Sequence, residues 1–298
     1  MSASVAVVVL SWNDRELTVR CLDSLASVTY PDVRVILVDN GSNDDTVEVV
    51  ARTYPEVELV RLSTNRGFAG GVNAGIEAAL RGDAGHVFLL NNDATVEPGV
   101  LQPLVGAVSR SVGAACSQIL QEGSGTIWYA GARYDPRRGH QGRHTGYGRP
   151  ALAETIAPYP TDRGCGGAML IPRAALERVG LLDEALFAYA EDVDWSLRAR
   201  ALGLEILVVP ASIVHHRVSA ASGGASSPAT LYYALRNGLV VAERYAPRGR
   251  LRTLGRRAEA FSAFVVQALR SGSRVAGLRA VLQGLRDASR RRLGPRAA

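Results

Sequence analysis

The chain has 298 residues, of which 47% are hydrophobic and 21% are charged, so it can bury a sizeable core. This composition excludes intrinsic disorder, collagen and low-complexity proteins. No apolar run approaches the roughly 18–20 residues of a membrane span, and the first residues are expected to form a strand rather than a signal peptide. Three widely separated cysteines, Cys21, Cys116 and Cys165, fit neither a disulfide framework nor a zinc site, which favours a reducing cytoplasm.

Charge is distributed unevenly along the chain. All 34 basic residues are arginine, and the formal net charge is +6. Residues 244–298 hold 14 arginines against Glu259 and Asp287, a net charge of +12, so residues 1–243 carry −6. The sequence therefore predicts a mildly acidic body followed by a strongly basic tail.

The first hundred residues alternate short apolar runs with helical patterns. Strands are expected at 5–10, 33–39, 57–62 and 86–91. Each run is continuously apolar, which is typical of a parallel sheet covered on both faces. Apolar residues at helical spacing predict a helix in each of the three intervals. This order indicates an α/β fold with right-handed crossovers.

The pattern is less regular after the fourth strand. A helix is expected from Pro98 to about Ser111, and an irregular excursion from 121 to 163. Regular patterns resume at 164–172, 173–179, 193–203 and 205–209. The last fifty residues predict helices with one apolar stripe each and arginine on the opposite faces.

Polar residues follow the ends of the four predicted strands. They occur at 11–13 (SWN), 39–42 (DNGS), 64–73 (TNRGFAGGVN) and 91–93 (NND). In open α/β sheets, ligands bind beyond the carboxyl ends of the strands. The four groups therefore predict one composite ligand pocket.

The glycines of this pocket do not form a common nucleotide-binding motif. Neither G-x-G-x-x-G at the first turn nor G-x-x-x-x-G-K-[ST] occurs, and the chain has no lysine. Gly67, Gly70 and Gly71 instead open the third predicted helix, where backbone N–H groups suit a diphosphate. The alternative is that these glycines allow tight packing of the helix on the sheet.

Asp93 ends a buried strand and is a candidate ligand for a divalent cation that bridges diphosphate oxygens. The alternative is a cap for the helix near Pro98, although Thr95 is closer to that position. His215 and His216 follow a later strand. Because successive side chains alternate faces, at most one of the two histidines points into a site.

A cluster of carboxylates, Glu191, Asp192 and Asp194, lies within the stretch FAYAEDVDWSLRAR. At a helix start these carboxylates would be favoured by the helix dipole. The alternative is that one of them is a general base in a partly apolar setting, which would tune its protonation.

Taken in order, these residues resemble the family 2 glycosyltransferases of the GT-A fold, within the branch of rhamnosyltransferase-like enzymes. The matching stretches are V-V-x-L-S-W-N, V-D-N-G-S-x-D, T-N-x-G-F-A-G-G-x-N, L-L-N-N-D, G-x-A-M-L-I-P-R, E-D-V-D-W-S-L-R, H-H-x-V-S and Y-Y-x-x-R-N. They cover about residues 4–245, and Asn-Asn-Asp stands where many relatives have Asp-x-Asp.

The resemblance implies an α/β GT-A domain over residues 1–243, with a mostly parallel, Rossmann-like central sheet. Residues 1–97 would be the nucleotide-binding half and residues 98–243 the acceptor-binding half. Residues 244–298 would form a helical, basic extension.

The resemblance also assigns roles to individual residues. Those expected to contact the nucleotide sugar are Ser11, Asn13, Asp39, Asn65, Gly67, Gly71, Asn73, Asn92 and Asp93. Asp93 and His216 would bind the metal, Mn²⁺ or Mg²⁺. Asp192 would be the base that deprotonates the acceptor hydroxyl, and Glu191 would orient it. The acceptor or donor-sugar pocket would be bordered by Gly166, Gly167 and Ala168, whereas Trp195 and Arg198 would pack and pair structurally.

The implied function is a metal-dependent, inverting transfer from a nucleoside diphosphate sugar to a hydroxyl of a cell-surface glycan or polyprenyl-linked saccharide. dTDP-rhamnose is the favoured donor and UDP-sugars are next. The alternatives are a nucleotidyltransferase, whose glycine-arginine-rich loop and phosphate-binding lysine are missing here, and a non-catalytic carbohydrate- or membrane-binding protein, which would have lost the carboxylates that this chain keeps.

Three interpretations of the basic tail are considered, each with a different binding partner. Amphipathic helices with arginine at residues 250–298 suit an anionic membrane surface, which predicts a cytoplasmic protein at the inner face of the cell membrane. The alternative is packing against the body or in a homodimer. Nucleic acid is not expected as a partner, because the body has no stretch that combines basic and stacking aromatic residues.

Overall fold

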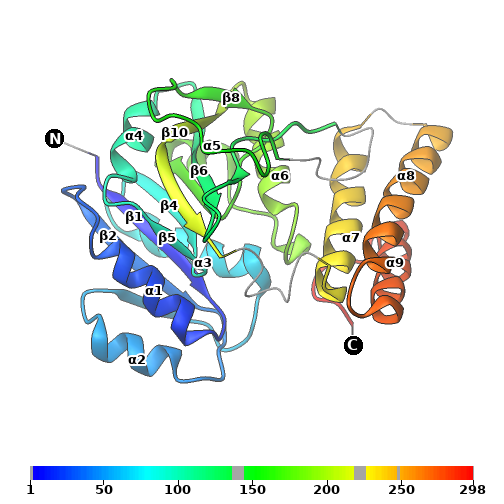
Figure 1. The fold of residues 1–298 in the computed structure, drawn as a ribbon, viewed down its shortest axis with the longest axis horizontal. Coiled ribbons are helices and arrows are strands. Elements are labelled where there is room, and N and C mark those ends of the chain that lie inside the picture. Colours follow the sequence, from blue (N-terminus) through cyan, green and yellow to red (C-terminus); the bar gives the residue numbers. More distant parts are fainter. Residues whose placement is uncertain (1–2, 136–143, 218–225, 247–248, 298) are drawn as a thin grey trace.

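The computed structural model describes residues 3–135, 144–217, 226–246 and 249–297 (Figure 1). The strands are β1 (Val5–Ser11), β2 (Val33–Asp39), β3 (Glu58–Arg61), β4 (His86–Asn91), β5 (Ala94–Val96), β6 (Val112–Gln121), β7 (Ile127–Tyr129), β8 (Tyr159–Thr161), β9 (Ala168–Pro172) and β10 (Glu205–His216). The helices are α1 (Arg15–Leu25), α2 (Thr46–Thr53), α3 (Gly67–Arg81), α4 (Leu101–Ala107), α5 (Arg173–Val179), α6 (Glu191–Ala201), α7 (Pro228–Tyr245), α8 (Arg250–Leu269) and α9 (Arg274–Ser289).

All ten strands belong to one sheet in the order β3-β2-β1-β4-β9-β6-β10-β5, with β7 paired to β6 and β8 to β10. The pairings of β1 with β2 and β4, of β2 with β3 and of β10 with β6 are parallel, whereas β5, β7, β8 and β9 run antiparallel to their neighbours. The expected α/β fold with a mostly parallel central sheet is confirmed. The continuously apolar strands form its core because both faces of the sheet are covered.

Close packing of α3 on the sheet depends on two glycines. A Cβ at Gly71 would collide with Leu10 of β1, and a Cβ at Gly75 would collide with Val8. The packing role that the sequence left open for the glycine cluster therefore holds for Gly71. Because α3 lies this close to β1, its first turn reaches the carboxyl edge of the sheet.

The strand β10 contains an irregularity that bears on its two histidines. Val209 pairs with Ser117 of β6 and Ile213 pairs with Gln118, so residues 210–212 are inserted as a bulge. Beyond the bulge the strand also pairs with β5, and His216 lies opposite Ala94. The end of β10 is thereby brought beside the end of β4.

Several local expectations are corrected by the structure. The helix expected from Pro98 to Ser111 is only α4, because the chain becomes extended at Val108 before β6. Thr95 lies in β5 and does not cap that helix. The excursion at 121–163 contains β7 and β8; residues 136–143 lie outside the described residues, as do the last two positions of the H-H-x-V-S motif, 218–219.

The three C-terminal helices α7, α8 and α9 pack together beside the sheet, and we call them the helical bundle (Figure 1). Its buried apolar residues come from all three helices, among them Leu235, Ala260 and Val281. The expected tail boundary at 243/244 falls near the end of α7, so α7 packs with the predicted tail. No helix among the described residues is long and apolar enough to cross a membrane.

Candidate active site

Side chains of β1, of α1 and of the residue that follows β4 form a hydrogen-bonded group at the carboxyl edge of the sheet. Ser11 Oγ lies 2.8 Å from Thr18 Oγ1, and Asn92 Nδ2 donates to the same Thr18 oxygen at 3.0 Å. Asp39 lies beside Ser11 in the register of β2 and accepts from the Ser42 N–H at 3.2 Å. The structure thus brings Ser11, Asp39 and Asn92 to one edge and adds Thr18, which the sequence motifs did not single out.

Asn13 joins the first two loops of this edge. Asn13 and Asp14 have left-handed backbones, with φ of 56° and 63°, which residues with a side chain rarely adopt. The Asn13 N–H donates to Ser42 Oγ at 2.7 Å, and Asn13 Oδ1 accepts from the Asn43 N–H at 2.9 Å. The loops after β1 and β2 are therefore fixed to each other where the nucleotide is predicted to bind.

The buried Asn40 holds the turn that starts α3. Its Nδ2 donates to Asn65 Oδ1 at 3.2 Å and to the Gly67 carbonyl at 3.0 Å, and its Oδ1 accepts from the Arg66 N–H at 2.9 Å. Asn65 Oδ1 also accepts from the Gly67 N–H at 2.7 Å. Asn40 lay within a predicted polar loop, but its partners are 25–27 residues further on, so only the fold shows its role.

Gly67 places the start of α3 against the loop that precedes α6. Its φ is +74°, and a Cβ at this position would collide with the Phe187 carbonyl and ring. The Ala69 N–H donates to the same carbonyl at 3.1 Å. A glycine is required here for both reasons, the left-handed backbone and the close approach.

Asn73 points away from this turn. Its Nδ2 donates to the Leu182 carbonyl and to Glu184 Oε1, each at 3.0 Å, and its Oδ1 accepts from the Leu182 N–H at 3.1 Å. Burial alone would raise the pKa of Glu184, but hydrogen bonds from Asn73 and Arg66 lower it below the ordinary value. Asn73 thus links α3 to the loop at 182–184, and contact with a donor stays a prediction.

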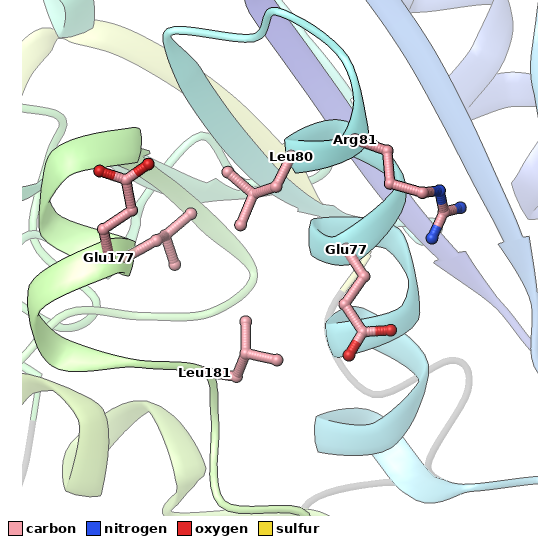
Figure 2. A pocket seen from close by; sticks show the side chains of 6 residues that line it. Glu77, Leu80, Arg81, Glu177 and Leu181 are labelled. Carbon is pink, nitrogen blue, oxygen red and sulfur yellow. The ribbon is translucent and has the colours of Figure 1, made fainter.

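A surface hollow of about 490 Å³ lies between α3 and α5, at the end of α3 remote from Gly67 (Figure 2). Its lining residues are Glu77, Leu80, Arg81, Leu176, Glu177 and Leu181. None of these is a predicted site residue. The hollow is therefore separate from the carboxyl edge of the sheet.

Asp93 and His216 form a buried pair at the meeting point of β4, β5 and β10. His216 Nε2 lies 2.8 Å from Asp93 Oδ1, and both side chains are less than 10% exposed. The Trp128 ring packs edge-on against the His216 imidazole, with 4.9 Å between ring centroids. His215 points elsewhere and contacts Glu97 Oε1 at 2.8 Å. Of the two histidines, His216 faces Asp93.

This pair offers two donor atoms for a cation, a carboxylate oxygen and an imidazole nitrogen. Both suit Mn²⁺, and a carboxylate suits Mg²⁺. Nδ1 of His216 is buried without a hydrogen-bond partner. Within the described residues, no group of three or more His, Cys, Asp or Glu side chains could hold a metal ion. The carboxylate and the imidazole are chemically suited to a divalent cation, and their binding of one stays a prediction.

The turn before β9 connects the Asp93 side of the edge to Asp192. The Asn91 N–H donates to the Gly167 carbonyl at 3.2 Å, while the Gly166 N–H donates to Asp192 Oδ2 at 3.2 Å. A Cβ on Gly166 would contact the Phe68 ring at 3.1 Å. The turn at 166–167 thus lies between β4, the start of α3 and Asp192, whereas Ala168 is fully buried in β9.

The helix α6 begins with the predicted catalytic carboxylates. Asp192 Oδ1 also accepts from the Val193 N–H at 2.7 Å, and Asp192 is partly exposed. Glu191 is 5% exposed, and its Oε2 is buried without a hydrogen-bond partner. Burial and the neighbouring Asp192 carboxylate raise the pKa of Glu191 well above the ordinary value. The two adjacent carboxyl groups therefore differ in environment: that of Asp192 is partly exposed to solvent, and that of Glu191 is buried.

The expected structural roles of the other α6 residues are observed. Trp195 is fully buried, and its indole N–H donates to the Gly180 carbonyl at 2.8 Å. Arg198 Nε donates to Asp194 Oδ2 at 2.9 Å. Asp194 also accepts from Arg244 at 2.9 Å, so this carboxylate ties α6 to α7 instead of facing the site.

We expect the Glu191→Gln variant to be more stable than the parent at pH 8 but not at pH 4. As the pH rises above the ordinary pKa of a glutamate, unfolded Glu191 loses its proton while folded Glu191 keeps it, so the parent loses stability. Glutamine does not ionise. Tm at pH 8 should therefore be higher in the variant than in the parent, and this difference should disappear at pH 4. Thermal unfolding across this pH range tests it, and a pH-independent difference would contradict it.

Comparisons with known proteins show the family of this chain. The family model "Glycosyl transferase family 2" matches residues 6–180. N-acetylglucosaminyl-diphospho-decaprenol L-rhamnosyltransferase of Mycobacterium tuberculosis (strain H37Rv) is 31% identical over 238 residues, covering 73% of this chain and 77% of that protein. dTDP-rhamnosyl transferase RfbF of Shigella flexneri is 19% identical over 248 residues, covering 81% of this chain and 80% of the relative.

Solved structures show the same fold. The mannosyltransferase PcManGT of Pyrobaculum calidifontis, in complex with GDP-Man and Mn²⁺, superposes with a TM-score of 0.60 at 21% identity, covering 97% of this chain and 76% of that one. GalNAc-T7 with UDP, GalNAc and Mn²⁺ gives 0.61 at 19% identity, covering 87% of this chain and 54% of that one. The fold is that of the GT-A glycosyltransferases. By its family match and its 31% identity to a relative over most of both chains, this protein is a glycosyltransferase and belongs to family 2.

Proposed function

We propose that this protein transfers rhamnose from dTDP-rhamnose to a hydroxyl of a polyprenyl-diphosphate-linked saccharide, with inversion at the anomeric carbon. Two relatives whose names specify rhamnosyl transfer support the sugar, one of them acting on a decaprenol-linked N-acetylglucosamine. The observation that carries the proposal is that the turn at 166–167 contacts both Asn91, two residues before Asp93 of the Asp93–His216 pair, and Asp192.

Asp93 and His216 would hold a divalent cation, Mn²⁺ or Mg²⁺. When bound, such a cation neutralises the charge that grows on the departing nucleoside diphosphate. The loops that carry Ser11, Asn13 and Asp39 would hold the nucleotide. Their hydrogen bonds to one another fix this part of the site before a donor binds.

Asp192 would accept the proton of the attacking hydroxyl. A partly exposed carboxylate can reach an acceptor, and its two hydrogen bonds to backbone N–H groups hold it in a fixed orientation. A single displacement requires one base opposite the leaving group. Glu191, enclosed and with a raised pKa, would support the position of Asp192 without taking the proton itself.

A donor panel tests the proposal. The full-length protein is incubated with dTDP-rhamnose, UDP-glucose, UDP-N-acetylglucosamine or GDP-mannose, with Mn²⁺, Mg²⁺ or EDTA, with and without N-acetylglucosaminyl-diphospho-decaprenol. Release of dTDP that depends on the cation and increases with the acceptor is the expected result. Preference for another nucleotide sugar would overturn the choice of donor, and full activity in EDTA would overturn the metal.

We also propose that the helical bundle contacts an anionic membrane through one face of α9. Val275, Arg279, Leu282 and Arg286 follow one another at helical spacing and are exposed, with Val275 65% and Leu282 57% accessible. Arginine beside exposed aliphatic side chains suits an interface between anionic headgroups and acyl chains. Such contact would bring the enzyme to a polyprenyl-linked acceptor at the inner face of the cell membrane.

We expect Arg279→Gln with Arg286→Gln to weaken binding to phosphatidylglycerol vesicles about 30-fold. Each arginine near an anionic surface contributes about 1 kcal/mol, and 2 kcal/mol corresponds to that ratio. Vesicle co-sedimentation measures it. The control is Arg52→Gln with Arg110→Gln, which removes the same charge from exposed positions of the body. Equal binding of both double variants would contradict a specific α9 surface.

A further inference from the structure

The loop that leads into the predicted base is strained. Phe187, Tyr189 and Ala190 all have left-handed backbones, with φ of 67°, 67° and 70°, although none is glycine. Such conformations persist only where surrounding contacts enforce them, and they tend to occur at functional sites. Asp192 follows two residues after this loop, so its place relative to Gly166 depends on what holds the loop.

A single buried amide on α7 holds most of the loop. Nδ2 of Asn237 lies 2.7 Å from the Leu186 carbonyl, 2.7 Å from that of Ala188 and 2.9 Å from that of Tyr189. Asn237 is fully buried, and its Oδ1 accepts from Arg236 Nε at 2.8 Å. Three carbonyl oxygens of the loop therefore share one buried donor group.

Arg236 extends this support to the end of the chain. Its guanidinium donates to the Leu186 carbonyl at 3.0 Å and to the Gly294 carbonyl at 2.7 Å, and it lies over the Tyr232 ring. The Gly294 N–H donates in turn to the Ala185 carbonyl at 2.7 Å. The loop before Asp192 is thus held between α7 and the segment that follows α9.

We propose that Asn237 and Arg236 are positioning residues for Asp192. The inference rests on the proposed function, because it takes Asp192 to be the base. Neither side chain needs to touch substrate. By holding residues 186–189, they set where α6 begins and therefore where the Asp192 carboxylate lies relative to the acceptor hydroxyl. The helical bundle is then part of the catalytic apparatus and not only an attachment to it.

The test is Asn237→Asp in the full-length protein, with Asn237→Ala as a second variant should the first not fold. Aspartate has the same shape but no N–H to donate, so the three carbonyls lose their common partner. A misplacement of about 1 Å can lower turnover about 100-fold. We expect kcat for dTDP release from dTDP-rhamnose, with Mn²⁺ and the decaprenyl-linked acceptor, to fall about 100-fold while the Kd for dTDP changes less than threefold.

Two further variants make the result specific. Val281→Ala removes packing in the same helical bundle but leaves every contact to the loop, so it should lower Tm while kcat stays within threefold of the parent. Asp192→Asn serves as the reference for loss of the base. Near-parental kcat in Asn237→Asp beside an inactive Asp192→Asn would overturn the positioning role alone. Parental kcat in Asp192→Asn would instead overturn the proposed function.

Discussion

Replacing Asp192 with asparagine should lower kcat about 1,000-fold and leave donor binding nearly unchanged. A positioned general base contributes typically 10²–10⁴-fold, and asparagine keeps the size and an acceptor oxygen for the Val193 N–H but cannot take a proton. Turnover is measured as release of dTDP from dTDP-rhamnose, and binding by titration with dTDP and Mn²⁺. A fall in turnover with unchanged dTDP binding would indicate loss of the general base, whereas a fall in both would indicate damage to the donor site.

Asp194→Asn is the matched control for this variant, because it changes a carboxylate of the same helix. Asp194 binds Arg198 and Arg244 and is 2% exposed, so its loss should lower Tm. Its kcat should stay within a few fold of the parent, because it does not face Gly166. If Asp192→Asn kept parental turnover, or if both variants lost the same activity, Asp192 would not be the base.

The second large effect is expected on the Mn²⁺ dependence of activity, when the adjacent histidines His215 and His216 are replaced one at a time. We expect His216→Ala to raise the Mn²⁺ concentration for half-maximal activity at least 10- to 100-fold, the range seen when even a residue behind a metal ligand is removed. His216 lies 2.8 Å from Asp93 in a buried position, so no solvent-exposed group can readily replace it. Activity measured against Mn²⁺ concentration, and Mn²⁺ binding followed by electron paramagnetic resonance, test this.

His215→Ala provides the control one position away. His215 is partly exposed and contacts Glu97 instead of Asp93, so its loss should leave the Mn²⁺ dependence within twofold of the parent. Equal effects at the two positions would argue against a cation at Asp93. The pair of variants thus tests which face of β10 carries the metal, independently of the donor sugar.

The fold of the first hundred residues could be predicted in detail because its information is local. Continuous apolar runs specified β1, β2, β3 and β4, and parallel strands necessarily bring their following loops to one edge. That geometry placed Ser11, Asp39 and Asn92 together before any contact was known. The alternation of side chains on an extended strand likewise predicted that only one of His215 and His216 would face a site.

The rest depends on contacts between distant parts of the chain. The sequence could not show that Asn40 pairs with the turn before α3, or that Asn73 would be engaged with Leu182. Nor could it show that the Arg236-Asn237 pair, noted only as a motif, holds the loop before Asp192. A single sequence also does not distinguish a helix that packs on the body from one that lies on a membrane, since both are amphipathic.

The bulge at residues 210–212 decides which histidine is available to Asp93. Side chains along a strand alternate between its two faces, so a shift of one residue exchanges them. Ser212 and Gln118 hold the bulge, through Ser212 Oγ at 2.8 Å from Ser117 Oγ and through Gln118 Nε2 at 3.2 Å from the Pro210 carbonyl. Insertion of one residue there, with the pairing beyond the bulge shifted by one position, would place His215 opposite Ala94, where His216 now faces Asp93. The two adjacent histidines would therefore keep an imidazole beside Asp93 after a one-residue insertion in the bulge, whereas a one-residue deletion would bring Arg217 to that position.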